Sequence, residues 1–416
     1  MADSLEIRLG ERRVGELTDL GGDRTIFTFD EAYADDPARP TLSLSFKSDA
    51  GLLLLDQRPS QTRLSPFFSN LLPEGPLRDY LAAQAGVKAT REFHLLAALG
   101  SDLPGAVTAH TADGVDLTDG GEERRATART EAADKVLRFS LAGVQLKFSA
   151  VGKTGGGLTI PAHGAGGDWI VKLPSTRYEG ISQNEFSMMT LAAKIGIEVP
   201  DIQLLPLDQI ANLPDGLGRL DGAAYAISRF DRPYGKERLH MEDFAQVFAL
   251  YPAEKYTRAS YRNIAEVIWR ETGEAGVVEF IRRLVFNALI GNADMHVKNW
   301  SLLYRDGINA TLAPAYDFVA TTAYLPDENA AMKVVRTRRW ADFSRDELAN
   351  LAGKAGLPET IVLRTATDTV AAFRETWSKE KAHLPLPRNV PEAIEQQLSI
   401  VPLAAPSMAF LAGKSQ

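Results

Sequence analysis

The stretch that decides the fold of this chain is LVFNALIGNADMHVKNWSLLY, residues 284–304, followed closely by LAPAYDFV, residues 312–319. Its first part completes an apolar stripe at helical spacing that ends at Gly291. Four polar or charged residues then stand before apolar sequence resumes: Asp294, His296, Lys298 and Asn299. The first question about function is what these side chains do between two stretches that both have the apolar pattern of a buried core.

The segment after this loop has the pattern of a β-hairpin, because Arg305-Asp306-Gly307 contains an Asp-Gly turn. A hairpin brings its two ends together, so Asn299 is expected close to Asp317, with Asp294 on the loop before both. Two carboxylates and an amide oxygen suit Mg²⁺. In protein kinases the order Asp-x-x-x-x-Asn, hairpin, Asp gives a catalytic base and the metal ligands.

This chain departs from the protein-kinase pattern on both sides of those residues. Asn292-Ala293 stand where kinases carry His-Arg, and Val319 stands where a glycine follows Asp-Phe. Taken singly, Asp294 and Asn299 are also residues that cap helices and turns. His296 is equally explained as a packed, hydrogen-bonded histidine, and Lys298 either neutralises a transferring phosphate or lines the loop. With six histidines and no cysteine in the chain, a zinc site is not favoured.

Composition limits the class of protein. The chain has 416 residues, 45% of them hydrophobic and 24% charged, which indicates two or three globular domains. A net charge of −8 opposes a broad nucleic-acid surface, and the short basic stretch KVVRTRRW, residues 333–340, is expected to be a solvated edge strand or loop. The N-terminus does not have the pattern of a signal peptide, and no apolar stretch is long enough to span a membrane. A cytoplasmic protein without membrane contact is therefore expected.

Periodicity divides the chain into four segments. Alternating stretches such as SLEIRLGERRVGEL and TLSLSF, followed by two helical patterns, predict an α+β subdomain over residues 1–110. Residues 111–135 hold almost no large apolar side chains and are expected to be a linker or exposed loop. Strand patterns predominate over residues 136–240 and helical patterns over residues 241–416. The fold class predicted is α+β and bilobal, with a strand-rich N-lobe and a helical C-lobe.

Kinase chemistry also requires a lysine on a strand to hold the nucleotide phosphates. Lys172 ends the apolar stretch DWIVK, and Glu185 on the following helix is a candidate partner. A turn of small residues at Ala142-Gly143, between two strand patterns, is a weak candidate for the phosphate-binding loop.

Several motifs occur in a fixed order along nearly the whole chain: RVGEL, FFSNLLPEGPLRDYLA, LLAALGSDLPGAV, SLAGVQLKFS, IVKLPS, NEFSMMTLAAKIGIEVP, SRFDR, LHMEDFAQ, KY, LIGNADMHVKNWSLL and LAPAYDFV. The series resembles the HipA-type toxin kinases of bacterial type II toxin–antitoxin modules. The resemblance implies a bilobal kinase-like core with an N-terminal subdomain. Ser228 stands where many relatives carry Glu, and glycine is expected near Val335 or Arg336, where this chain has none.

The resemblance also implies roles for individual residues. Asp294 matches the catalytic base, with Lys298 beside it, and Asn299 and Asp317 match the Mg²⁺ ligands. Ser140 matches the serine that such kinases autophosphorylate. The positions implied to bind ATP are Ala142, Gly143, Val144, Gln145, Lys147, Lys172, Glu185, Ser228, Arg229, Phe230, Asp231, His296 and Asn299.

At the level of function, the resemblance implies a kinase that uses ATP and Mg²⁺ to phosphorylate Ser or Thr of a protein. Translation components such as aminoacyl-tRNA synthetases are the implied targets, with growth arrest or persistence as the outcome. The implied partner is a HipB-like antitoxin dimer, through which the chain mainly reaches operator DNA. A non-catalytic module that binds nucleotide and antitoxin and a small-molecule phosphotransferase are the alternatives.

Overall fold

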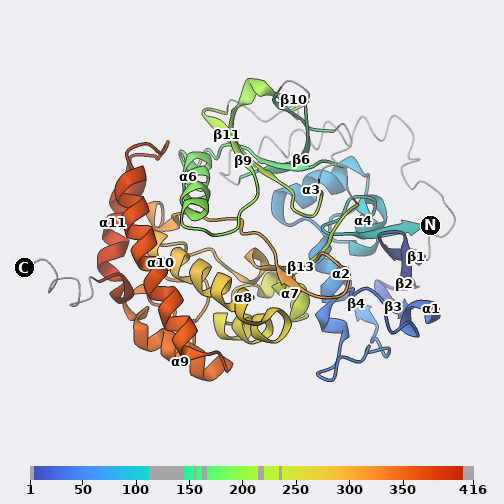
Figure 1. Cartoon of the computed structure of the whole chain (residues 1–416). Helices are drawn as coiled ribbons and strands as arrows, with labels where there is room; N and C mark the ends of the chain where they lie inside the picture. Colours follow the sequence, from blue (N-terminus) through green and yellow to red (C-terminus); the bar gives the residue numbers. More distant parts are fainter. Residues whose placement is uncertain are drawn as a thin grey trace, which may run out of the picture. The chain divides into compact units, whose positions relative to one another are not determined.

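A computed structural model of the chain describes residues 4–111, 145–153, 156–161, 166–213, 220–233 and 237–405. The chain divides into two compact units (Figure 1). The first contains Met1–Ser182, Pro200–Lys255 and Ser301–Ala313, and the second contains Gln183–Val199, Tyr256–Trp300 and Pro314–Gln416. The described sheets belong to the first unit and the longest helices to the second. The predicted α+β class is therefore confirmed.

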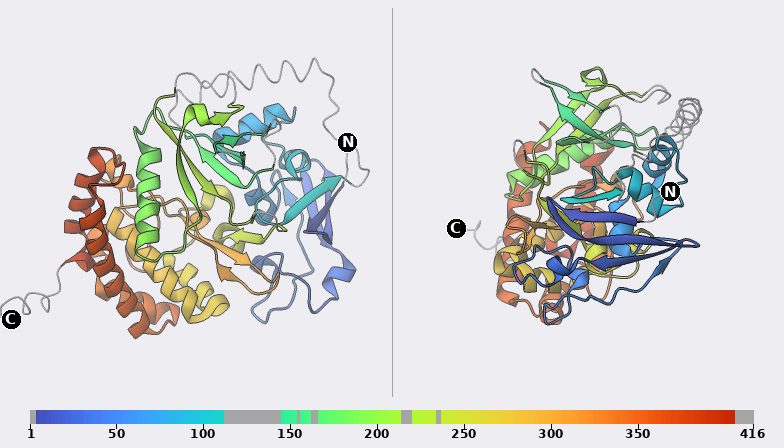
Figure 2. Two further views of the ribbon diagram at one scale, coloured as in Figure 1. Left: turned by 45° about the horizontal axis from the view of Figure 1, so that its top comes forward. Right: turned by 90° about the vertical axis from the view of Figure 1, so that its right-hand side faces the viewer.

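The N-terminal part of the first unit is an antiparallel sheet with strand order β4-β3-β2-β1-β5 (Figure 2). Alternate residues of β1 are buried, as its sequence pattern predicts. Phe27, Phe68 and Leu95 join the sheet and its helices in one apolar core. The elements are β1 (Ser4–Leu9), β2 (Arg12–Gly21), β3 (Arg24–Phe29), α1 (Glu31–Ala34), β4 (Ser60–Gln61), α2 (Pro66–Leu71), α3 (Gly75–Gln84), α4 (Glu92–Leu99) and β5 (Val107–Thr111).

The strand predicted for TLSLSF is wrong, because Leu44–Phe46 form the 3₁₀ turn η1. Ser43 caps this turn, and its hydroxyl accepts a hydrogen bond from the N–H of Ser45. The carboxylate of Glu242 accepts hydrogen bonds from the hydroxyl of Ser43 (2.5 Å) and the N–H of Leu44 (3.0 Å). Side-chain bonds of this kind compete with strand pairing.

A second sheet of the first unit has strand order β10-β7-β6-β8-β11-β9. Phe148, Val171 and Ala226 form its core, against which Leu77 and Tyr80 of α3 pack. The strands are β6 (Lys147–Gly152), β7 (Leu158–Thr159), β8 (Trp169–Lys172), β9 (Ile202–Pro206), β10 (Ile210–Ala211) and β11 (Ala223–Ser228), with the 3₁₀ turn η2 (Leu207–Gln209) between β9 and β10.

A third sheet contains β12 (His240–Asp243), β13 (Ser301–Tyr304) and β14 (Thr311–Leu312). The hairpin predicted from the Asp-Gly turn is β13–β14 and is confirmed. The helix predicted from Met241 begins later than expected, because residues 240–243 pair with β13. Asp243 then forms a capping box with Gln246 and starts α7 (Phe244–Val247), which the 3₁₀ turn η3 (Pro252–Glu254) follows.

Helix α8 (Tyr261–Ile290) is the central element of the second unit, and it contacts α9, α10 and α11. Gly273 interrupts it with φ 64° and ψ −154°, so this element consists of two helices joined at a kink. In Figures 1 and 2, α10 and α11 lie side by side. The other helices of this unit are α6 (Ile181–Lys194, from Gln183 onward), α9 (Arg345–Ala355), α10 (Glu359–Glu380) and α11 (Asn389–Ile400).

Short 3₁₀ turns complete the second unit: η4 (Val297–Asn299), η5 (Thr321–Ala323), η6 (Trp340–Asp342) and η7 (Pro402–Ala404). The basic stretch from Lys333 to Arg339 has no helix or strand, in agreement with the loop alternative. Among the helices that the structure describes, none has the length and apolar character needed to cross a bilayer.

Candidate active site

Helix α8 ends at Gly291, the first residue of the loop that carries the predicted catalytic residues. Gly291 has φ 67° and ψ 45°, the left-handed conformation of a helix cap, and its N–H donates to the carbonyl of Asn287. A Cβ at this position would lie 2.3 Å from Oγ1 of Thr322. Backbone conformation and close packing therefore both require glycine here.

Asn292 is the central hydrogen-bonding residue of the loop and is only 1% exposed. Its Oδ1 accepts from the N–H of Asp294 (3.1 Å), and its Nδ2 donates to Oδ1 of Asn287 (2.8 Å) and to the carbonyl of Asp317 (3.1 Å). One side chain thus joins the end of α8, the predicted catalytic base and the predicted metal ligand. This role was not predicted from the sequence, in which Asn292 stands out only as a departure from the kinase pattern.

The backbone around Asp294 is held by several further bonds. Its carbonyl accepts from the N–H of His296 (2.8 Å) and from Nδ2 of Asn299 (2.9 Å). The buried hydroxyl of Tyr261 donates to the carbonyl of Met295 (2.8 Å). Burial, with the negative charge of Asp294 adding to it, raises the pKa of Tyr261, so this hydroxyl stays protonated and acts as a donor. Asp294 itself is exposed to solvent.

Asp317 follows the hairpin and has φ 59°, a left-handed conformation that is uncommon for a residue with a side chain. Two bonds tie its segment to the loop: the Asn292 bond to its carbonyl and a bond from the hydroxyl of Tyr316 to the carbonyl of Lys298 (2.9 Å). Phe318 is buried, and its ring centroid lies 5.0 Å from that of Phe286 on α8. Strained backbone that is held in this way is characteristic of functional sites.

The donor set of Asn299 and Asp317 suits a magnesium ion. Asn299 directs its Nδ2 to the carbonyl of Asp294, so Oδ1 is the atom of this amide that can act as an oxygen ligand. Asp317 adds a carboxylate, and Mg²⁺ typically takes one or two carboxylates together with substrate phosphates and water. In the part of the chain that the structure describes, no group of three or more His, Cys, Asp or Glu side chains is placed to hold a metal ion.

His296 and Lys298 differ in burial. His296 is 6% exposed, and its ring meets the ring of Tyr256 edge to face with centroids 4.9 Å apart. These contacts agree with a packed histidine. Lys298 is half-buried in η4, where its carbonyl accepts the Tyr316 bond. Their predicted roles toward phosphate and nucleotide stay predictions.

Two lysines of the predicted ATP site lie opposite each other in the second sheet. Lys147 of β6 pairs in register with Lys172 of β8, so their side chains share a face of the sheet. Lys172 also faces Tyr225 of β11, with Nζ 5.7 Å from the ring centroid. The in-register pair places two positive charges side by side on one face, and their predicted role toward the nucleotide phosphates stays a prediction. Gln145 is half-buried just before β6.

Other predicted nucleotide residues lie on different elements. Glu185 is 1% exposed on α6 and belongs to the second unit, whereas Lys172 belongs to the first, so their pairing stays a prediction. Ser140, Ala142, Gly143 and Val144 lie outside the described residues.

The resemblance assigns Ser228 to Phe230 to a hinge segment that meets adenine, and Asp231 to the acid beside it. Ser228 is the last residue of β11. The N–H of Ser228 donates to the carbonyl of Asp201, and that of Arg229 donates to the carbonyl of Asp168. Asp231 is 4% exposed, and its carboxylate accepts from Arg229 (2.8 Å) and Arg232 (2.8 Å). Phe230 is half-buried, and the contacts of this segment with a nucleotide stay predictions.

The carboxylate of Asp231 also joins the hinge segment to the turn that precedes β5 in the N-terminal sheet. Asp231 accepts from the N–H of Gly105 (2.8 Å), and Arg232 donates to the carbonyls of Leu103 and Gly105 (both 2.7 Å). Arg232 also pairs with Asp102 (3.2 Å). Both cations lower the pKa of Asp231 against the effect of its burial, so the carboxylate is ionised.

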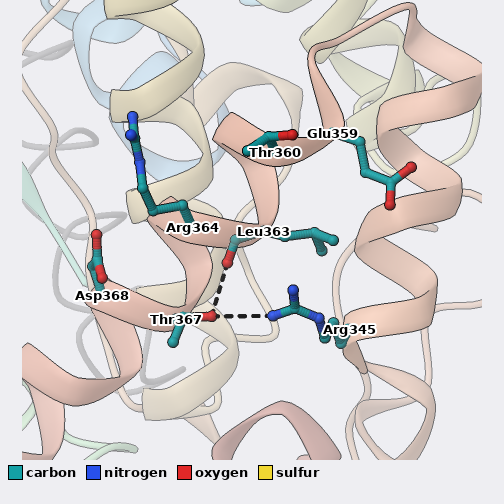
Figure 3. A pocket seen from close by; sticks show the side chains of 7 residues that line it. All are labelled: Arg345, Glu359, Thr360, Leu363, Arg364, Thr367 and Asp368. Atoms are coloured by element: carbon teal, nitrogen blue, oxygen red, sulfur yellow. Dashed lines mark hydrogen bonds between the residues drawn. The ribbon is translucent and has the colours of Figure 1, made fainter.

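A hollow of about 450 Å³ lies on helices α9 and α10, away from all these residues in sequence (Figure 3). Thr367 there accepts a bond from Arg345 (3.3 Å) and donates one to the carbonyl of Leu363 (2.8 Å). None of the residues predicted for catalysis, nucleotide or metal lines it.

Comparison with known proteins gives two family matches. The family described as the HipA N-terminal domain matches residues 5–110, and that described as the HipA-like C-terminal domain matches residues 139–377. "Putative kinase Y4dM" of Sinorhizobium fredii is 53% identical over 96% of this chain and 97% of its own length. "Serine/threonine-protein kinase toxin HipA" of Shewanella oneidensis is 27% identical over 96% of this chain and 90% of its own length.

A solved structure has the same fold. It is that of the Shewanella oneidensis toxin–antitoxin complex of HipA, HipB and operator DNA, and its matching chain gives a TM-score of 0.73. The alignment covers 98% of both chains at 22% sequence identity.

Proposed function

The chain belongs to the family of HipA-like kinases, and from this premise we propose that it transfers the γ-phosphoryl group of ATP to a Ser or Thr hydroxyl of a protein, using Mg²⁺. Family membership supports kinase chemistry in general. The residue roles, the nucleotide and the acceptor are parts of the proposal.

The observation that carries it is the way in which Asn292 and Tyr316 tie the loop of Asp294 and Asn299 to the segment of Asp317. Tyr316 and Lys298, which are 18 positions apart in the sequence, are thereby held together within one unit. A phosphoryl-transfer site works mainly by positioning and by neutralising charge, so a rigid base next to metal ligands is the arrangement it requires.

Each side chain then has a defined task. Asp294 is exposed, so its carboxylate can accept the proton of an incoming hydroxyl, while its backbone is fixed by the loop. Lys147 and Lys172 offer positive charge to the nucleotide phosphates from one face of their sheet. Asn299 and Asp317 would hold Mg²⁺, which when bound neutralises phosphate charge.

The finer parts of the proposal come from the resemblance. We propose a translation component such as an aminoacyl-tRNA synthetase as the target, autophosphorylation at Ser140, and growth arrest or persistence as the outcome. The proposed partner is a HipB-like antitoxin dimer. With a net charge of −8, this chain would reach operator DNA mainly through that antitoxin, in an assembly of the kind solved for the Shewanella proteins.

The test is transfer of radiolabelled phosphate from ATP, with Mg²⁺, to the chain itself and to proteins of a cell extract. We expect Asp294→Ala and Asp317→Ala to lose at least about 100-fold in rate. Asp346→Ala, which changes a carboxylate with an 85% exposed side chain on α9, is the matched control and should keep the wild-type rate.

The alternatives predict other outcomes of the same experiment. A non-catalytic module would bind ATP in calorimetry without any transfer by the wild type. A small-molecule phosphotransferase would consume ATP only when a small acceptor is supplied and would label no protein. Either result would overturn the proposal of a protein kinase.

A further inference from the structure

Tyr256 makes a contact that no role assigned so far explains. Its hydroxyl donates to Oδ1 of Asp294 at 2.5 Å, and both residues belong to the second unit. Tyr256 lies between η3 and α8 and is 41% exposed. A tyrosine of the surface thus binds the carboxylate that the proposed reaction uses as its base.

The rest of the loop fixes the backbone of Asp294 but leaves its side-chain torsions to other contacts. The bonds from Asn292, His296 and Asn299 all involve main-chain atoms of Asp294. An exposed carboxylate samples several rotamers unless contacts hold it, and only some of these rotamers point at an acceptor. The Tyr256 hydroxyl bonds the carboxylate itself and so selects among these rotamers.

The phenol is in turn held in place by the loop. Its ring meets the buried ring of His296 at an interplanar angle of 78°, a favourable edge-to-face contact. His296 is two residues from Asp294, and its N–H donates to the Asp294 carbonyl. Ring and hydroxyl therefore contact the same short segment, and the hydroxyl is aimed by packing on a buried residue.

A tyrosine at this position could also block the base by taking the place of the acceptor hydroxyl. The chemistry of the carboxylate argues against a simple block. An ionised carboxylate has two oxygens with about four sites for hydrogen bonds, and Tyr256 bonds one oxygen. The Tyr256 bond by itself therefore does not prevent an acceptor hydroxyl from binding Asp294.

We propose that Tyr256 is a positioning residue for the phosphotransfer reaction, which holds the Asp294 carboxylate in the rotamer that receives the acceptor proton. The inference rests on the proposed function, since it assigns a helper to the base of that reaction. The tyrosine does not itself touch substrate and is not a catalytic residue.

The experiment compares wild type with Tyr256→Phe, which removes the hydroxyl and keeps the ring against His296. The assay uses ATP, Mg²⁺ and, as acceptor, the protein that wild type labels in the transfer experiment. We expect kcat to fall about 5- to 10-fold with KM for ATP within about twofold. A purely structural role would not lower kcat selectively while leaving KM for ATP unchanged.

Tyr251→Phe is the matched control, because Tyr251 lies five residues earlier and packs under Arg63 instead. It should leave kcat and KM for ATP unchanged. Equal denaturation midpoints for both variants and wild type would exclude unfolding as the cause of a lower rate.

The outcomes separate this inference from the proposed function. If wild type transfers no phosphate, the proposed function fails. If wild type is active and Tyr256→Phe equals it in kcat, only the positioning role is overturned. A Tyr256→Phe enzyme that is faster than wild type would overturn it too, and would assign the tyrosine to blocking the base.

Discussion

Replacing Asn292 by alanine tests whether one buried amide holds the candidate site together. The change removes three hydrogen bonds, to Asn287, to the N–H of Asp294 and to the carbonyl of Asp317. At about 1 kcal/mol net for each bond, and with buried partners left unsatisfied, the free energy of unfolding should fall by about 3–4 kcal/mol. The strained φ of Asp317 also loses one of its restraints.

The effect on the reaction should exceed the effect on folding. Misplacing a base and a metal ligand by about 1 Å can reduce a rate about 100-fold, so kcat should fall by that order even where the variant is fully folded. Urea denaturation gives the stability, and phosphate transfer below the unfolding transition gives kcat. Asn292→Asp keeps an acceptor for the N–H of Asp294 but turns a buried carboxylate toward Oδ1 of Asn287 and the carbonyl of Asp317, so it should cost at least as much stability as Asn292→Ala.

The control is Asn389→Ala on α11, which removes a single exposed bond to the carbonyl of Ala323 (2.8 Å). Its cost should stay below about 1 kcal/mol with an unchanged kcat. If Asn292→Ala costs no more than this control and keeps kcat within about twofold of wild type, the loop does not depend on the amide, and the reasoning from its three bonds is refuted.

Other changes probe the surrounding framework. Gly291→Ala should cost at least about 2 kcal/mol in urea denaturation, because alanine disfavours φ 67° and its Cβ would meet Thr322; a neutral result would contradict the packing argument. Asp231→Asn removes one of the two carboxylates that pair with the buried guanidinium groups of Arg229 and Arg232, Asp102 being the other. It should cost about 3 kcal/mol, whereas a loss below about 1 kcal/mol would show the Asp231 carboxylate to be dispensable. Burial raises the pKa of Glu242 from 4.5 to about 7, so the folded state keeps a proton that the unfolded state releases, and stability contributed by this group falls by up to about 3 kcal/mol as pH rises from 4.5 to 7. Glu242→Gln should remove this part of the pH dependence of unfolding, and an unchanged profile would refute it.

The features of the site that the sequence predicted depend on short-range patterns. The Asp-Gly turn predicted a hairpin, and a hairpin requires its two ends to meet whatever surrounds it. The stripe on α8 and the glycine after it likewise predicted where the helix ends. Such features depend on residues that lie within about 30 positions of one another, so local periodicity and turn chemistry are enough to predict them.

The features that the sequence did not predict depend on distant partners. TLSLSF alternates like a strand, yet Glu242, almost 200 residues later, bonds Ser43 and Leu44 and favours a turn. Asp231 was assigned to the nucleotide from the resemblance alone, and nothing local reveals its bond to Gly105. The Tyr256 bond to Asp294 spans 38 residues and has no periodic signature. Only tertiary structure shows such contacts.

Burial now separates the tasks of the polar residues that interrupt the apolar stretch after α8. Asn292 and His296 are 1% and 6% exposed, and their bonds and ring contacts go to the chain itself. Asp294 is exposed and Asn299 half-buried, so their functional atoms can reach a substrate or an ion. Residues of the first kind cannot meet an acceptor, and residues of the second kind cannot hold the loop rigid by themselves. A loop that must do both therefore needs alternating buried and exposed polar residues, which is the pattern that made it conspicuous in the sequence.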